Sequence, residues 1–390
     1  MTKTIRFIPI LLFSFLLFTC KKEEIIQSSS IDCSYSDSSG KHPKRNIYSS
    51  ILEKYRKKGL PGISVLLTDT NGTWIGATGY ADIEKGIKYS PCHISKAASI
   101  TKLLVGSLVL KLQDQGKINI EDPVSKYIDN SILKKIDGVE GKTLKQLMNH
   151  TTGIYDLITN PAFYLSIINY PNRVWTQDDL LKFVYYKKAA GINTPYPANY
   201  SNTNTLLLSM SIDAATGEKL DKLLRQLILT PFGMNDTYYQ GREVIPDIAA
   251  QGYFDLHGNG TIVNVSNYIT GSGHGFGGIY SNVFDLNKFI TALFIDKTLL
   301  SQNALDLMYE VNGENVDYYC GVSTIKKFTQ KNTYGIGHTG RDLGYNANLF
   351  YFPERKCTMV FFVNYGTNGN SSLKQVFLDF ENELTDELIK

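Results

Sequence analysis

The order of apolar patterns along the chain constrains its fold more than any other feature. Strand-like runs lie near both ends, a mostly helical stretch separates them, and a helical pattern flanks each group of strands. We therefore expect an α+β fold, in which an antiparallel sheet built from both ends of the chain is flanked by N- and C-terminal helices as an α/β sandwich, with a mainly helical domain inserted. The predicted helices are 46–59, 100–115, 143–148, 177–186, 203–216, 220–229 and 371–388, and the predicted strands are 62–68, 73–78, 334–339, 346–352 and 358–364.

The same patterns divide the chain into a leader, a tether and one large domain. We assign 1–20 to a lipoprotein-type signal peptide and 21–45 to a polar, serine-rich tether. The remaining residues, 46–390, form the folded domain, with 46–95 and 235–390 in its α/β part and 96–234 in its helical part.

The N-terminus predicts export. Lys3 and Arg6 precede an apolar run, 7–18, that is shorter than the roughly 20 residues needed to span a bilayer. Leu17-Phe-Thr-Cys20 resembles the cleavage box of a bacterial lipoprotein, which makes Cys20 the expected lipidation site and the cell envelope (periplasm-facing or outer membrane) the expected location. An ordinary cleaved signal or an uncleaved anchor is the alternative.

Composition and cysteine spacing exclude some classes of function. A hydrophobic content of 43% with 20% charged residues is typical of a folded globular protein. The net charge of +3 without a dense Lys/Arg block argues against nucleic acid as a partner. The chain lacks CxxC and HExxH spacing, so no zinc site is suggested. Of the cysteines after Cys20, we expect Cys320 to pair with Cys357, because both lie in strand-like segments near the C-terminal end.

Ser99 and Lys102 are the candidate nucleophile and base. They lie three residues apart, where a polar approach turns into an apolar helix, and residues at this spacing share a helix face. A serine hydroxyl needs an adjacent base, and burial lowers the pKa of a lysine so that its amine can act as one. The spacing alone is weak, because S-x-x-K occurs elsewhere in the chain. Taken alone, it is better explained by a helix-start serine beside a snorkelling lysine.

Two further motifs stand at element boundaries. Tyr200-Ser-Asn202 follows a proline-rich polar loop that enters a helix, and such a loop can project a tyrosine and an amide into a cleft. His338-Thr339-Gly340 ends a strand-like run, where glycine lets a ligand approach the backbone. Each motif has an ordinary structural explanation when it is taken alone. All three motifs in this order are much less likely to occur together by chance than any one of them.

With these motifs the chain resembles the penicillin-recognising serine hydrolases, which include class C β-lactamases, serine DD-carboxypeptidases and their esterase and D-aminopeptidase relatives. Leu144-Lys-Gln-Leu-Met-Asn-His-Thr-Thr-Gly-Ile154 and the glycine-rich segment from Gly271 to Gly278 also resemble family segments, so the resemblance covers roughly 47–364. It implies an α/β sandwich with a helical domain, a catalytic site between them, and a reaction that needs no metal or organic cofactor.

The resemblance also implies residue roles. Ser99 attacks an acyl carbon, Lys102 and Tyr200 share the proton transfers in an order left open, and Asn202 positions Lys102 and the substrate amide. Backbone N–H groups of Ser99 and Arg341 hold the oxyanion, and Thr339 binds a substrate carboxylate or acyl chain. His150 is expected to be structural, and His274 is a weak candidate for the cleft.

The substrate stays open between several classes. His338 stands where most β-lactamases have lysine, so a titrating histidine replaces a fixed charge, and Arg341 is a candidate for the missing cation. We favour a D-amino-acid peptidase or DD-carboxypeptidase acting on cell-wall peptides. An esterase or amidase on small acyl substrates, a β-lactamase and a non-catalytic envelope binding protein are the alternatives, and the oligomeric state is open.

Overall fold

The computed structural model describes residues 25–33, 39–191, 198–271, 273–310, 313–314 and 318–390. Its main sheet has nine antiparallel strands in the order β3-β2-β1-β14-β13-β12-β11-β10-β9. These strands are β1 (Gly62–Asp69), β2 (Gly72–Asp82), β3 (Ile87–Lys88), β9 (Gly313–Glu314), β10 (Tyr318–Cys320), β11 (Ile325–Lys327), β12 (Gly335–Asp342), β13 (Tyr345–Phe352) and β14 (Cys357–Val363).

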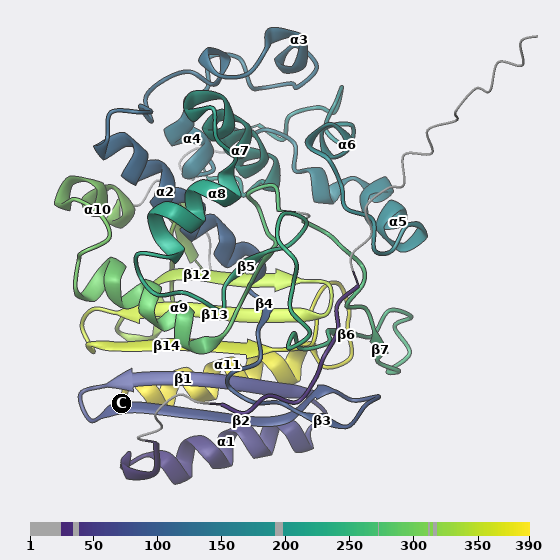
Figure 1. Cartoon of the computed structure of the whole chain (residues 1–390), viewed down its shortest axis with the longest axis vertical. Coiled ribbons are helices and arrows are strands. Elements are labelled where there is room, and N and C mark those ends of the chain that lie inside the picture. Colours follow the sequence, from purple (N-terminus) through teal and green to yellow (C-terminus); the bar gives the residue numbers. More distant parts are fainter. Residues whose placement is uncertain (1–24, 34–38, 192–197, 272, 311–312, 315–317) are drawn as a thin grey trace, which may run out of the picture.

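The first and last strands of the chain meet in the middle of this sheet. β1 pairs with β14, with Ile63 opposite Val363, so both ends of the chain build one sheet as predicted. Figure 1 shows the N-terminal strands continuing directly into the C-terminal ones. β11 pairs with β12 only over 335–337, so the stretch 338–342 of β12 has a partner, β13, on one side.

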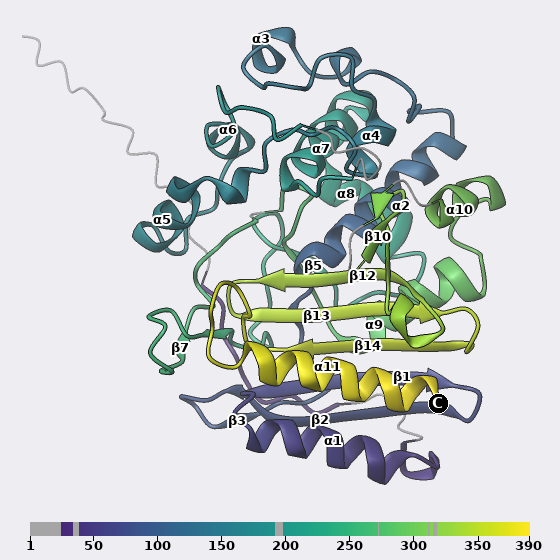
Figure 2. The same cartoon turned by 180° about the vertical axis from the view of Figure 1, so that it is seen from behind.

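Two terminal helices cover one face of the sheet. α1 (Arg45–Lys57) and α11 (Lys374–Ile389) lie side by side on it, as Figures 1 and 2 show. Tyr48 and Phe377 of these helices pack with Val65 and Phe361 from the sheet. The neighbouring residues Leu66 and Val360 lie in the other core, because successive side chains of a strand point to opposite faces. α9 (Val283–Ile290) packs on this second face.

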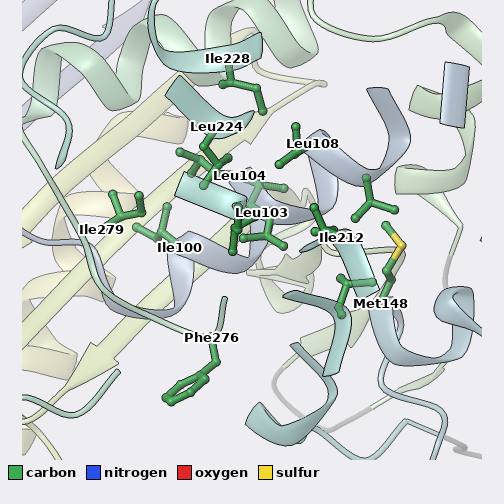
Figure 3. Packing of buried hydrophobic residues seen from close by; sticks show 14 of the residues in the cluster. Ile100, Leu103, Leu104, Leu108, Met148, Ile212, Leu224, Ile228, Phe276 and Ile279 are labelled. Carbon is green, nitrogen blue, oxygen red and sulfur yellow. The ribbon is translucent and has the colours of Figure 1, made fainter. Parts of the chain in front are cut away.

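The helical part stands above the β12 end of the sheet. Its central helix, α2, is buried along nearly its whole length, and Figure 3 shows Leu103, Leu104 and Leu108 of α2 packed among side chains from other helices. The helices are α2 (Thr101–Asp114), α3 (Asn130–Leu133), α4 (Leu144–Met148), α5 (Pro161–Asn169), α6 (Gln177–Leu181), α7 (Asn202–Thr216), α8 (Leu220–Leu224) and α10 (Gln302–Tyr309).

Short strands connect the two parts. β4 (Ser95–Lys96), β8 (Ile279–Ser281) and β5 (Tyr238–Tyr239) form a small sheet in the order β4-β8-β5, and β6 (Tyr253–Phe254) pairs with β7 (Val263–Asn264) as a hairpin. Among the residues described, no helix is both long and apolar enough to cross a membrane.

The segment predicted as a tether is in part docked on the domain. The backbone N–H of Ile26 donates to Asn267 at 3.0 Å, Ser28 is buried, and His93 Nε2 lies 3.0 Å from the carbonyl oxygen of Ser29. Residues 25–33 are therefore held by the domain, which differs from the polar tether predicted for 21–45.

The disulfide prediction is also wrong. Cys33 is bonded to Cys92, with 5.4 Å between their Cα atoms, and Cys357 is a free, buried thiol. The bond fastens the N-terminal segment seven residues before Ser99. A disulfide requires two cysteines whose Cβ atoms are close and face each other. The strand-like sequence around Cys320 and Cys357 does not determine whether this condition is met.

Candidate active site

Ser99 lies at the junction of the two parts, in a tight turn, Ala98–Ile100, that leads into α2. The turn is held against β12 by Gly340: a Cβ on Gly340 would lie 2.1 Å from the carbonyl oxygen of Ala97. Ala98 has a φ of 49°, a left-handed conformation that is uncommon for a residue with a side chain. Such strain is concentrated at functional sites, where the surrounding structure enforces it.

Lys102 is the buried centre of the site. Its Nζ lies 2.9 Å from Ser99 Oγ, 2.8 Å from Asn202 Oδ1 and 2.7 Å from the carbonyl oxygen of Phe276. A charged ammonium has three N–H donors, and these three oxygens account for all of them. The predicted pairing of Ser99 with Lys102 and Asn202 is thus present in one hydrogen-bonded cluster.

Burial lowers the pKa of Lys102 to about 7, and the negative charges of Asp156 and Asp342 oppose the shift. Near neutrality the amine is therefore partly uncharged, with two N–H donors and one lone pair. The oxygens of Asn202 and Phe276 only accept, so the lone pair can face only the hydroxyl of Ser99, which has a proton to donate. The cluster orients the amine as a base toward Ser99.

Asp156 fixes the orientation of Asn202 and was not singled out from the sequence. Its carboxylate accepts from the side-chain amide of Asn202 at 3.1 and 3.2 Å and from the backbone N–H of Asn202 at 3.0 Å. With the amide nitrogen held there, the amide oxygen must point to Lys102. Burial raises the pKa of Asp156 above its ordinary value.

Tyr200 lies between two histidines. The centroid of its ring is 4.3 Å from that of His150 and 6.2 Å from that of His338, and Lys102 Nζ lies 5.0 Å from it. His150 Nδ1 lies 3.3 Å from the backbone nitrogen of Ser201 and 3.3 Å from Asn204 Nδ2, which anchors the ring beneath Tyr200. His150 is a structural hydrogen-bonding residue, as expected, and it also positions Tyr200.

His338 does not titrate near neutrality, contrary to the expectation from its residue type. Burial, with the positive charges of Lys102 and Arg341, lowers its pKa to about 3. Its Nδ1 lies 2.6 Å from the carbonyl oxygen of Thr339, and since a carbonyl only accepts, Nδ1 carries the proton of the neutral ring. The β12 edge therefore presents an uncharged imidazole at neutral pH.

The side chains of Thr339 and Arg341 are not in the cluster with Lys102. Both line a separate cavity of about 500 Å³ beside α11, because they alternate along β12 with His338 and Gly340. The guanidinium of Arg341 donates to Glu381 Oε1 at 2.9 Å, so its charge is already paired. Arg341 also borders the Ser99 cavity, where its backbone remains a candidate for the oxyanion site.

A buried ion pair closes the site at the far end of β12. Asp342 and Thr270 border the same cavity as Ser99, and Lys96 Nζ lies 2.8 Å from Asp342 Oδ2. Lys96 is 1% exposed, so this pair is shielded from solvent. His274 lies outside the cluster: its Nε2 is 2.6 Å from the carbonyl oxygen of Trp175, and its Nδ1 is 3.1 Å from Arg242. Cys20 lies outside the described residues.

Comparison with known proteins decides the family. The model of the Beta-lactamase family matches residues 49–378, which is most of the chain. The chain belongs to the β-lactamase family. Members of this family are serine hydrolases, so the resemblance inferred from the motifs is confirmed, and so is the α+β fold.

Some of the curated relatives carry penicillin-binding names. Penicillin-binding protein 4* of Bacillus subtilis (strain 168) is 24% identical over 301 residues, 73% of this chain and 64% of its own length. Protein flp of Staphylococcus aureus (strain COL) is 30% identical over 217 residues, 55% of this chain and 42% of its own length. The chain thus spans less than two thirds of the length of these relatives.

Two solved structures of amide-hydrolysing enzymes share the fold over nearly their whole length. A D-stereospecific amidohydrolase from Streptomyces sp. has a TM-score of 0.73 and 24% identity, covering 85% of this chain and 96% of its own. D-amino acid amidase from Ochrobactrum anthropi SV3, complexed with L-phenylalanine, has a TM-score of 0.76 and 22% identity. The match covers 88% of this chain and 98% of the amidase chain. At these identities the likeness concerns the fold.

Proposed function

We propose that this β-lactamase-family protein is a serine amidase or peptidase that forms an acyl-enzyme on Ser99, with Lys102 as the base. The observation that carries the proposal is the contact set of Lys102, whose lone pair, in the neutral amine, has only the Ser99 hydroxyl to face. A base with a pKa near the working pH combines a useful uncharged fraction with the ability to return the proton.

In the acylation step, the proton of Ser99 Oγ passes to Lys102 Nζ as Oγ bonds to the acyl carbon. The carbonyl oxygen becomes negative, and we assign its stabilisation to the backbone N–H groups of Ser99 and Arg341. Collapse of this intermediate breaks the bond to the leaving nitrogen or oxygen, which takes the proton from Lys102 by way of Tyr200. Water then attacks the ester, and the same groups move protons in reverse, releasing the acid and restoring Ser99.

The charges along β12 support substrates without a carboxylate on the leaving side. His338 is neutral at physiological pH, and Arg341 is paired with Glu381. The segments that the structure leaves undescribed within the domain, 192–197, 272, 311–312 and 315–317, contain no lysine or arginine. A carboxypeptidase or β-lactamase benefits from a fixed cation for the carboxylate of its substrate, whereas an amide or ester of an amino acid needs none.

We therefore rank the hydrolysis of amides or esters of D-amino acids as the first candidate function. The names of fold neighbours, a D-stereospecific amidohydrolase and a D-amino acid amidase, support this order. Carboxypeptidase action on cell-wall peptides is the second candidate, supported by the penicillin-binding names of some curated relatives. For location we propose export with a lipid on Cys20; the Cys33–Cys92 disulfide supports an oxidising compartment.

Intact-mass spectrometry and hydrolysis assays test the proposal. The protein is incubated with D-phenylalaninamide, p-nitrophenyl acetate and benzylpenicillin, with Ser99→Ala as the control. We expect Ser99-dependent turnover of the amide and the ester. A lasting adduct with penicillin and no amide turnover would transfer the proposal to the carboxypeptidase, and equal turnover by the wild type and Ser99→Ala would overturn it.

A further inference from the structure

A larger apolar cavity adjoins the cavity at Ser99. It has a volume of about 530 Å³, whereas the space bordered by Ser99 itself is about 30 Å³. Apolar side chains from three places line it: Tyr164 and Ile168 of α5, Phe254 and Leu256 at the β6–β7 hairpin, and Leu343, which follows β12. Figures 1 and 2 show α5 and this hairpin on the same flank of the molecule, beyond the end of β12.

The two cavities share a wall and follow each other along the same strand. Tyr164 borders both, and Leu343 of the larger cavity comes directly after Asp342 of the smaller one. A substrate bound at Ser99 therefore reaches the apolar cavity past Tyr164.

The proton path indicates which part of the substrate points that way. Tyr200 and His338 lie at one end of the free β12 edge, and the leaving group must lie there to receive its proton. Asp342 is four residues further along β12, about 13 Å away at the rise of a strand. Since Gly340 packs on the turn carrying Ser99, the acyl group extends toward Asp342, Tyr164 and the apolar cavity.

Charged groups at this end are already satisfied. Asp342 is paired with Lys96. Asp255, which also lines the larger cavity, accepts the backbone N–H groups of Asn259 and Gly260 at 3.1 Å each and so fixes the hairpin turn. Recognition there depends on apolar surface and shape, and about 530 Å³ lies within the range of roughly 300–1,000 Å³ typical of ligand pockets.

We propose that this cavity is an acyl-side subsite that binds an aromatic or long alkyl substituent of the substrate. The proposal rests on the acyl-enzyme function proposed above and specifies its substrate: an acyl donor with a bulky apolar group and a neutral leaving group. Because burial of each additional methylene group is favourable, a substrate whose acyl chain fills the cavity should react with a higher kcat/KM than one with an acetyl group.

The test compares kcat/KM for p-nitrophenyl acetate and p-nitrophenyl octanoate, which have the same leaving group. The wild type should prefer the octanoyl ester at least tenfold. Ile168→Asp, in the cavity wall, should reduce this preference at least fivefold with little change on acetate. The matched control is Leu165→Asp on the same helix: Leu165 is 60% exposed and does not line the cavity, and Ile168 is 40% exposed, so both changes are tolerated by the fold.

Each outcome has a distinct meaning. A preference lost in Ile168→Asp and kept in Leu165→Asp supports the subsite. Ser99-dependent turnover of both esters with no preference, or with the same preference in both variants, overturns the subsite and leaves the proposed function standing. Absence of Ser99-dependent turnover of either ester overturns the proposed function, and the subsite with it.

Discussion

Replacing Lys102 by methionine should change how the stability of the protein depends on pH. In the folded protein the pKa of Lys102 is about 7, and in the unfolded chain it returns to about 10.5. Between these values the unfolded chain binds a proton that the folded protein does not bind. Raising the pH removes that proton and so favours the folded state of the wild type, whereas methionine has no proton to lose.

The size of the effect follows from the shift. One pKa unit corresponds to 1.36 kcal/mol, so the free energy of unfolding of the wild type should rise relative to that of Lys102→Met by about 1.4 kcal/mol per pH unit in this interval. Between pH 7.5 and 9.5 the difference between the two proteins should therefore change by about 2–3 kcal/mol, with the variant losing its relative advantage as the pH rises.

Chemical denaturation at pH 6, 7.5, 8.5 and 9.5 measures this difference, and subtracting the variant removes the pH dependence of the groups that Lys102 does not influence. Lys102→Ala serves as the control, because it should give the same slope with a different offset if the amine and not the packing of methionine is responsible. A difference that stays constant from pH 7.5 to 9.5 would show that Lys102 keeps its charge in the folded protein, and the base assigned to Ser99 would be lost.

Other consequences can be measured on the same protein. The rate of acylation by p-nitrophenyl acetate should rise with pH around a midpoint near 7, because Lys102 must be uncharged to accept a proton; a rate independent of pH from 5.5 to 8.5 would contradict this. Asp156→Ala should lower kcat at least tenfold with little change in KM, since Asn202 loses the partner that orients it; full activity would refute that positioning role. Cys33→Ser should reduce the free energy of unfolding by about 4 kcal/mol, the expected effect of opening a loop with a separation of 59 residues, and an unchanged melting temperature would count against it.

Most of the fold could be predicted because its signals are local. The helical spacing of Tyr48, Leu52 and Tyr55 and the apolar runs of β1 and β14 gave the right elements, within a few residues at their ends. The pairing of the N-terminal and C-terminal strands in one sheet then followed, because strands from the two ends of the chain can satisfy each other's backbone hydrogen bonds. The candidate site residues Ser99 and Lys102 could be proposed because their motif falls at the start of the buried helix α2, and Asn202 because its motif falls at the start of α7.

The features that were missed depend on long-range geometry. Asp156 acts on a residue 46 positions away, and no local pattern marks it. Arg341 and Thr339 were assigned to the substrate although alternation along β12 puts their side chains on the face opposite His338 and Gly340, which the sequence could have revealed. Burial moved the pKa of His338 out of the neutral range, and burial at a domain junction is not visible from residue type.

The junction between the two parts explains why the site depends on small residues at defined places. The turn with Ser99 belongs to the helical part, and the strand edge facing it belongs to the sheet, so their separation sets the geometry of any oxyanion site between them. Gly340 permits the contact, because any side chain there would meet Ala97, and the left-handed Ala98 is the strained link that turns the chain into α2. Ser99, Lys102 and the Asn202 oxygen that accepts from Lys102 all belong to the helical part, whereas the carbonyl oxygen of Phe276 belongs to the α/β part. A shift of the helical part against the sheet would therefore keep Ser99, Lys102 and Asn202 together, and would alter the Lys102–Phe276 contact and the contacts along β12.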